Sequence, residues 1–328
     1  MQLLTLSGIH KQQGNRSILE DISFTQQRFQ KLALAGETGS GKTTLLKIIA
    51  GLIQPTAGKV LFEQVRVLGP DEKLMPGHPG IGYVSQQFEL RNNYRVEEEL
   101  DYTNKLTDEE ANAIYEVCRI SHLLKRRTDQ LSGGERQRIV TARTLIASPR
   151  LLLLDEPFSN LDGAHKQVMQ QMIEDIGKKL NISCILISHD PQDVLSWADE
   201  ILVLQNGQLV QQASPTVIYR QPVNEYVAGL FGPYNLVDAR QAAAHGLITG
   251  AEPATKNLLV RPEQIILSPD PSPNTIQATI HAIRFFGSYY EADVYIDSLK
   301  LLARLFHQPV DINAPVYLSF TNDAAWYI

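Results

Sequence analysis

Short apolar runs alternate with segments of helical spacing over about the first 210 residues of the chain. Leu151–Leu154 and Cys184–Ile187 are compact apolar runs, as expected for parallel strands that are buried on both faces. Thr44–Ile53 and Ala164–Leu180 carry apolar residues at helical spacing. This alternation of strands and helices predicts an α/β domain with a mainly parallel sheet.

Residues 87–148 break this alternation and predict a small helical subdomain inserted into the α/β domain. Val96–Lys105 is acidic and has helical spacing. Thr107, with Glu110 three residues later, matches a capping box in which Thr107 is the N-cap residue.

The pattern changes again after Pro215, where short helical turns are interrupted by prolines and glycine. From Asn235 onward the apolar residues fall in short β-like runs, which predict a small barrel or sandwich. These runs are Asn257–Val260, Ile276–Ile283, Tyr289–Ile296, Lys300–Leu305 and Val316–Phe320. We therefore expect two domains, residues 1–235 and residues 236–328.

Composition supports a folded chain of this kind. The 328 residues include 43% hydrophobic and 20% charged residues, which excludes whole-chain disorder. The net charge of −6 implies no basic face, so we expect no nucleic-acid partner. Cys118 and Cys184 fit no metal knuckle or redox pair, and we expect both to be buried apolar residues in a reducing compartment.

Nothing in the sequence predicts a membrane span, because no apolar run reaches about 18 residues. The N-terminal segment Met1–Thr5 also lacks the charged start and apolar middle of a signal peptide. We expect a soluble, cytoplasmic protein.

A glycine-rich segment follows the short apolar run that ends at Ala33 and Leu34. It matches G-x-x-x-x-G-K-[ST] with Gly36, Glu37, Thr38, Gly39, Ser40, Gly41, Lys42 and Thr43, and Thr44 follows. Glycines let backbone N–H groups point at phosphate oxygens, and the following helix presents its positive end there. Lys42 would reach the β- and γ-phosphates, and the Thr43 hydroxyl can ligate Mg²⁺. A plain glycine-rich turn is the alternative, and the strand–loop–helix context argues against it.

Two carboxylates, Asp155 and Glu156, end the apolar run Leu151–Leu154. This places them at the carboxyl edge of the sheet, where ligands bind. Asp155 would hold Mg²⁺, through water, and Glu156 would polarise an attacking water molecule. Acidic strand ends are common, so this feature has weight only together with the phosphate loop.

A second anion site is predicted at Leu131–Arg138, where Ser132, Gly133 and Gly134 open a helix that runs to about Ala147. The helix start has N–H groups that no side chain obstructs. A simple N-cap at Ser132 with a flexible turn is the alternative.

These three features, in this order, resemble the ATP-binding cassette ATPases, and Leu131–Arg138 looks like that family's signature sequence. Three further residues match the family in order: Gln86 as the Q-loop glutamine, Asp162 in the D-loop Ser159–Asp162, and His189 as the switch histidine. Taken alone, a histidine at the position of His189 is more often a structural residue at a strand end, but its place in this series favours the functional role.

The resemblance implies an ATPase that uses ATP and Mg²⁺ and works as a head-to-tail homodimer. Each ATP would lie between the phosphate loop of one copy and Ser132, Gly133 and Gly134 of the other. Glu156 would act on the attacking water and His189 would contact the γ-phosphate. Gln86 would join Thr43 and Asp155 in holding Mg²⁺ and link it to the helical subdomain. Catalysis would consist mostly of positioning and charge neutralisation.

One position departs from the family pattern. Gln13 stands where the family usually has the aromatic residue that stacks on adenine. An amide stacks more weakly than an aromatic ring, so we expect looser adenine discrimination and tolerance of GTP.

The C-terminal part resembles importer ATPases that carry an oligonucleotide-fold (TOBE) domain. The matching segments are Tyr219–Pro222, Phe231–Leu236 and Val260–Glu263. The tail is shorter than in sugar importers, which favours ferric iron or polyamine as the cargo, with sulfate, molybdate or sugar as alternatives. Arg261 and Glu263 are expected to form a buried ion pair that fixes this domain.

The resemblance also implies partners. Residues Gln86 to Tyr94 would meet the coupling helix of an integral membrane permease, although Phe88–Tyr94 is also compatible with a simple loop. A separate solute-binding protein is implied, and the chain would lie on the inner face of the cell membrane. A soluble regulator switched by ATP-driven dimerisation is the alternative from another class, and the intact Glu156 and His189 favour the transport ATPase.

Overall fold

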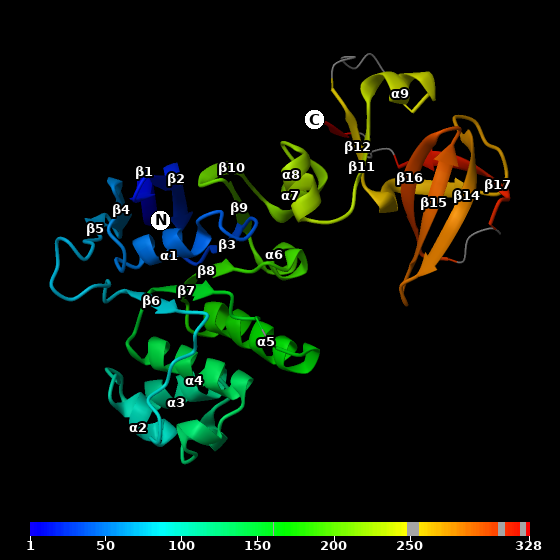
Figure 1. Cartoon of the computed structure of the whole chain (residues 1–328). Helices are drawn as coiled ribbons and strands as arrows, with labels where there is room; N and C mark the ends of the chain where they lie inside the picture. Colours follow the sequence, from blue (N-terminus) through cyan, green and yellow to red (C-terminus); the bar gives the residue numbers. More distant parts are fainter. Residues whose placement is uncertain (160, 248–255, 308–311, 322–325) are drawn as a thin grey trace. The chain divides into compact units, whose positions relative to one another are not determined.

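The computed structural model describes residues 1–159, 161–247, 256–307, 312–321 and 326–328. These residues form two compact units, Met1–Pro215 and Thr216–Ile328 (Figure 1). The domain boundary after residue 235 stays a prediction, and the compact units divide earlier in the chain.

A six-stranded sheet forms the centre of the first unit, with the strand order β10-β9-β3-β8-β7-β6. Its strands are β3 Lys31–Ala35, β6 Ile81–Val84, β7 Leu151–Asp155, β8 Ser183–Ile187, β9 Glu200–Gln205 and β10 Gln208–Ala213. The pairs β6·β7, β7·β8, β8·β3 and β3·β9 are parallel, and only β10 pairs antiparallel, with β9. The predicted α/β domain with a mainly parallel sheet is therefore confirmed.

Both faces of this sheet are buried. Leu151 and Leu153 of β7 belong to one core, whereas Leu152 and Leu154 belong to the other. Successive side chains of a strand point to opposite faces, so a fully apolar strand needs a cover on each side. Burial of each such leucine side chain stabilises the folded state by about 1.5–3 kcal/mol relative to leaving it exposed to water.

One cover is an antiparallel sheet together with helix α1 Lys42–Ile49. This sheet has the order β2-β1-β4-β5, with strands β1 Gln2–Gln13, β2 Arg16–Gln27, β4 Ala57–Phe62 and β5 Val65–Arg66. Helix α1 begins and ends earlier than the predicted Thr44–Ile53. It ends because Gly51 adopts φ 74° directly after the C-cap residue Ala50, a conformation that stops a helix.

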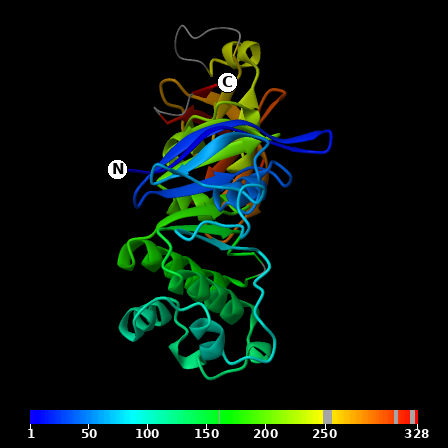
Figure 2. The same cartoon turned by 90° about the vertical axis from the view of Figure 1, so that its left-hand side faces the viewer.

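The other cover consists of helices, whose bounds are α2 Val96–Asp101, α3 Asp108–Val117, α4 Gly133–Ile146, α5 Gly163–Lys179 and α6 Pro191–Trp197. Short 3-10 turns at Ser121–Leu123 and Thr128–Gln130 connect α3 to α4. Seen in Figures 1 and 2, α2, α3 and α4 lie at the end of the unit opposite to the N-terminal strands. The predicted helical insert is thus present.

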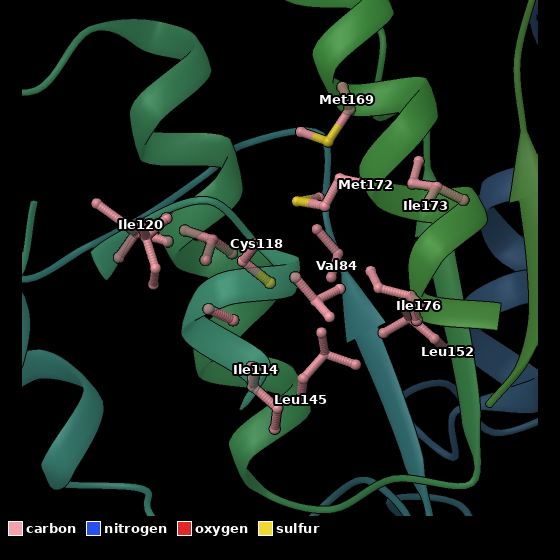
Figure 3. Packing of buried hydrophobic residues seen from close by; sticks show 14 of the residues in the cluster. Val84, Ile114, Cys118, Ile120, Leu145, Leu152, Met169, Met172, Ile173 and Ile176 are labelled. Carbon is pink, nitrogen blue, oxygen red and sulfur yellow. The ribbon is translucent and has the colours of Figure 1, made fainter. Parts of the chain in front are cut away.

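The core of the insert packs against the sheet through α5. Figure 3 shows Val84, Ile114, Cys118, Ile120, Leu145, Leu152, Met169, Met172, Ile173 and Ile176 in this cluster. Cys118 and Cys184 are free and buried, as expected, and burial raises the pKa of each thiol to about 12.

Local capping in the insert agrees with the sequence, but one helix is shorter than predicted. The capping box of Thr107 and Glu110 is formed. Helix α2 stops at Asp101 instead of Lys105, whose amide donates to the carbonyl of Ile146 at the end of α4. A tertiary contact therefore overrides the helical pattern.

The second unit is built mainly of β-strands around one core. One sheet has the order β11-β12-β18 and the other the order β13-β17-β14-β15-β16. The bounds are α7 Pro215–Arg220, α8 Glu225–Leu230, β11 Asn235–Val237, α9 Ala239–Ala244, β12 Leu258–Val260, a 3-10 turn Pro262–Gln264, β13 Ile265–Ser268, β14 Ile276–Phe285, β15 Tyr290–Ile296, β16 Leu299–Leu305, β17 Pro315–Phe320 and β18 Trp326–Tyr327. All five predicted strands are present, and β11, β13, β18 and α9 were not predicted.

The expected ion pair between Arg261 and Glu263 is wrong. Arg261 is 1% exposed, and its guanidinium donates to backbone carbonyls instead. These carbonyls belong to Tyr219, Ala228, Gly232 and Pro233, at 2.9–3.1 Å. The Glu263 carboxylate accepts a hydrogen bond from the Tyr219 hydroxyl at 2.7 Å. The carbonyls at the ends of short helices satisfy the buried cation, so a carboxylate is not needed.

Candidate active site at the carboxyl edge of the central sheet

The phosphate loop connects β3 to α1 and needs glycine at two tightly packed positions. Gly36 has φ 148°, and a Cβ there would lie 2.3 Å from the carbonyl oxygen of Leu204. Gly41 has φ 100°, and a Cβ there would lie 2.7 Å from the side chain of Leu19 on β2. The loop is therefore held between β9 and β2, with a curvature that other residues do not allow.

Lys42 is the cation of this loop and is only 8% exposed. Its Nζ donates to the carbonyl oxygens of Gly36 and Glu37 at 2.7 and 2.8 Å. Burial lowers the pKa of Lys42, whereas the carboxylates of Glu156 and Asp155 act in the opposite direction. A partly desolvated ammonium group inside a curved loop suits a phosphate ligand.

Asp155, the last residue of β7, is 3% exposed and is held by two hydroxyl groups. Thr43 Oγ1 donates to its Oδ1 at 3.0 Å, and the Tyr83 hydroxyl donates to its Oδ2 at 2.8 Å. Burial raises the pKa of Asp155, against the effect of these two hydrogen bonds. Sequence reasoning missed Tyr83, although a phenol in the otherwise apolar strand β6 next to β7 was a usable signal.

The donor set of Thr43 and Asp155 fits Mg²⁺. A hydroxyl and a carboxylate oxygen 3.0 Å apart are hard oxygen ligands, which Mg²⁺ prefers together with water and phosphate. Gln86, the third expected ligand, instead directs its amide Nε2 at Glu156 Oε2 at 3.2 Å.

Glu156 is the point at which the expected catalytic residues meet. Its carboxylate Oε2 accepts from Gln86 and lies 3.4 Å from Nδ1 of His189. Its backbone has φ 52°, a left-handed conformation that is strained for a residue with a side chain. The amide of Glu156 donates to the carbonyl of Ile187 on β8, which holds the residue in this conformation.

A cavity of about 210 Å³ opens beside this group, and Glu156, Ser159, Lys166 and His189 are among its lining residues. The described contacts thus bring Gln86, Glu156 and His189 together from three segments that are far apart in the sequence.

A charged network lies behind His189 and was not expected from the sequence. Lys166 of α5 pairs with Asp190 at 2.6 Å and with Asp193 at 2.8 Å. Partial burial opposes protonation, but the hydrogen bonds to both aspartates raise the pKa of Lys166. The Ser188 hydroxyl donates to Asp193 and accepts from the amide of Asp190. The network therefore fixes both neighbours of His189.

Ser132 caps helix α4, as the alternative interpretation of the signature segment proposed. Its hydroxyl accepts from the amide of Glu135, and the Glu135 carboxylate accepts from the amide of Ser132. Ser132 and Gly133 are exposed, and a Cβ built at Gly133 would meet no atom within 4 Å apart from its chain neighbours and the backbone of its own helix. The start of α4 is therefore both capped and open to an approaching group.

The other expected site residues are placed on separate elements. Asp162 caps α5 and accepts from the amide and the ring of His165. Asn160 of the same D-loop segment lies outside the described residues. Gln13 is exposed at the end of β1, opposite Arg16 across the hairpin turn.

Two family models match the chain: "ABC transporter" over residues 19–159 and "TOBE domain" over residues 258–328. A sulfate/thiosulfate import ATP-binding protein of Mesostigma viride is 30% identical over 333 residues, covering 98% of this chain and 94% of that protein. A maltose/maltodextrin import ATP-binding protein of Yersinia pestis is 30% identical over 334 residues, covering 92% of this chain and 87% of that protein. The chain belongs to the ABC transporter family. It is an importer-type ABC ATPase with a TOBE domain, so the expected family and enzyme class are confirmed.

A solved structure supports the fold of this ABC ATPase. The cbiO1 protein of Clostridium perfringens, part of the ABC transporter complex cbiONQ, superposes with a TM-score of 0.60 at 24% identity. The match covers 66% of this chain and 90% of that one. Among the residues that the structure describes, none of the helices is long and apolar enough to span a membrane.

Proposed function

We propose that the group around Glu156 is the hydrolytic centre of this importer ATPase. The observation that carries the proposal is the convergence of Gln86 and His189 on one carboxylate oxygen of Glu156. Glu156 follows Asp155 directly, and Asp155 is bonded to Thr43 of the phosphate loop. The phosphate-binding and water-activating groups are thereby held by adjacent residues of one strand end.

Each side chain then has a defined task. Lys42 and the phosphate-loop amides, with Gly36–Thr44, bind the phosphates of ATP. Thr43, Asp155 and the amide oxygen of Gln86 would hold Mg²⁺, which when bound offsets the charge that develops on the phosphates. Glu156 accepts a proton from the attacking water, and His189 contacts the terminal phosphate.

Two copies of the chain complete the site in a head-to-tail homodimer. Ser132, Gly133 and Gly134 are exposed or half-buried at the positive end of a 14-residue helix, which favours an anion. The D-loop residue Asp162 would lie at the same dimer contact. Adenine would meet the exposed Gln13, with the weaker stacking expected of an amide.

Glu156→Gln tests this assignment. We expect ATP, but not ADP, to shift the variant to a dimer in sedimentation velocity experiments, and its ATPase rate to fall about 100-fold or more. Glu109→Gln, an exposed substitution on α3, is the control and should retain turnover. Normal turnover in Glu156→Gln would contradict the proposal.

The segment Gln86–Tyr94 is the proposed contact with an integral membrane permease. Asn92, Asn93 and Tyr94 are exposed, and the segment begins at Gln86 next to the hydrolytic group. With this contact, the ATPase would lie on the inner face of the cell membrane, and a separate solute-binding protein would deliver the cargo. We propose no nucleic-acid partner, because the net charge of −6 provides no general attraction for phosphate backbones.

For the cargo, we propose ferric iron or polyamine, with sulfate, molybdate or sugar as the alternative. The two import relatives, named for sulfate or thiosulfate and for maltose, support the alternative at equal identity. The test is to isolate the ATPase with its permease in vesicles and measure ATPase stimulation by binding protein loaded with each cargo in turn. Stimulation by only sulfate or maltose would exclude the ferric iron and polyamine proposal.

A further inference from the structure

A buried carboxylate lies outside the hydrolytic group. Glu99 of α2 has a side chain that is 1% exposed, and it is bracketed by two arginines. Arg91 Nε lies 2.7 Å from Glu99 Oε2, and Arg143 Nη1 lies 2.5 Å from Glu99 Oε1. A buried charge is tolerated only where partners of opposite charge hold it in good geometry.

The two arginines belong to functionally different segments. Arg91 lies in Gln86–Tyr94, the proposed permease contact, whereas Arg143 lies on α4, the helix that Ser132 caps. Arg143 also donates to the backbone carbonyl of Glu89 at 3.0 Å. Glu99 therefore joins the permease-facing segment, Gln86–Tyr94, to the signature helix, α4, through charge-assisted hydrogen bonds.

Arg91 is itself held in place on several sides. Its guanidinium lies 4.4 Å from the ring centre of Tyr94 and 4.6 Å from that of Tyr102. The Thr128 hydroxyl donates to the backbone carbonyl of Arg91 at 2.7 Å. The hydrogen bond to Glu99 raises the pKa of Arg91. A displacement of this segment relative to α4 would break these contacts together.

We propose that Glu99 is a positioning residue that makes the permease-facing segment and the signature helix move as one body. The inference rests on the proposed function, in which the first segment meets the permease and the second meets ATP bound to the other copy. ATP-driven closure of the dimer, sensed at Ser132, is then transmitted through Glu99, Arg91 and Arg143 to residues 88–95, which comprise most of the segment Gln86–Tyr94 and the adjoining Arg95. In the reverse direction, permease movement sets the orientation of Ser132.

Hydrogen exchange in a Glu156→Gln background tests this transmission. We expect ATP to slow amide exchange at residues 36–44, at residues 132–138 and at residues 88–95 in this background. Adding Glu99→Gln should remove the ATP response at residues 88–95 and keep it at residues 36–44. The ATP concentration for half-maximal dimerisation should also rise about fivefold or more, the lower range of a coupling effect. A merely structural role would speed exchange equally with and without ATP.

Glu97→Gln is the matched control, since Glu97 lies on the same helix in a partly exposed pair with Arg95 at 3.7 Å. It should leave the ATP response unchanged. If Glu99→Gln does not fold, Arg91→Gln, which removes a cation with a 38% exposed side chain, should weaken the response at residues 88–95 in the same way.

The outcomes separate the inference from the proposed function. An unchanged ATP response at residues 88–95 in Glu99→Gln, or in Arg91→Gln when it is the variant that folds, overturns the inference alone. Without any ATP response at residues 36–44 and 132–138 in the Glu156→Gln background, the proposed function fails, and the inference fails with it.

Discussion

Asp155 shows how the surroundings of one residue prepare it for a ligand. Its carboxylate is almost fully buried, and burial raises its pKa, which means that the ionised form is disfavoured by its location. Two hydroxyl groups, from Thr43 and Tyr83, offset part of this cost. A divalent cation would offset more of the cost of burying the charged carboxylate. Asp155 is therefore a suitable ligand for Mg²⁺.

Tyr83→Phe removes one of the two hydroxyl groups without changing the shape of the ring. Among the described residues, Thr43 then supplies the one remaining hydroxyl that donates to Asp155, so we expect the Mg²⁺ concentration for half-maximal ATPase activity to rise about tenfold. Binding of Mn²⁺, followed by its EPR signal in the presence of ATP, should weaken by a similar factor. Tyr115→Phe, buried in the helical insert, is the control. Equal metal dependence in wild type and Tyr83→Phe would contradict the expected role.

At the scale of elements, one carboxylate on β15 forms ion pairs with both neighbouring strands, β14 and β16, of the second unit. Asp293 of β15 pairs with Arg284 of β14 at 2.6 Å and with Lys300 of β16 at 2.8 Å. The hydrogen bond from Arg284 is the main cause that lowers the pKa of Asp293 to about 2, and Lys300 adds to it. Cross-strand charge pairs of this kind stabilise the sheet in which they lie.

Asp293→Asn should therefore destabilise the second unit in a pH-dependent way. The folded pKa is lower than the unfolded value of 3.8, so the pair stabilises the fold above about pH 4 and ceases to do so as the pH falls toward 2. We expect a loss of about 1 kcal/mol at pH 7, because solvent screens the partly exposed cations. Urea unfolding between pH 7 and pH 2.5 measures this, with exposed Asp270→Asn as the control. If the difference in unfolding free energy between wild type and Asp293→Asn does not shrink as the pH falls, the assignment is contradicted.

At the scale of the whole molecule, Arg261 explains why residues that follow Pro215 belong to the second unit. Its buried guanidinium takes carbonyls at the ends of α7 and α8 as hydrogen-bond partners. Arg261 thereby attaches both helices to the β-rich core, together with the hydrogen bond from Tyr219 to Glu263, and the compact unit begins at Thr216.

Arg261→Gln should loosen this attachment. It leaves buried carbonyls without donors, which we expect to cost about 3 kcal/mol in the second unit. Scanning calorimetry of the full chain should show a lower transition temperature for that unit, and limited proteolysis should cut within residues 216–234. Arg261→Lys, which keeps the charge but has fewer donors, should lie between the two. A transition as high as in wild type would show that the carbonyl contacts are not stabilising.

The sequence alone determined the features whose chemistry is local in the chain. The phosphate loop could be predicted because its glycines and Lys42 are contiguous. The capping box at Thr107 and the N-cap at Ser132 could be predicted because each cap residue lies three residues from the amide that it accepts from. The buried strands could be predicted because apolar runs on two faces have no other stable location. The family resemblance then ordered Gln86, Glu156 and His189 along the chain.

Only the tertiary structure decided which distant side chains meet. Tyr83 on Asp155, Lys166 between Asp190 and Asp193, Glu99 between two arginines, and Arg261 on carbonyls could not be predicted from the sequence. The reason is physical: a buried charge needs a partner, but any donor or cation that the fold brings within about 3 Å can serve. The type of residue determines that a buried charge needs a partner. Which partner it meets is determined by the packing of elements that are far apart in the chain.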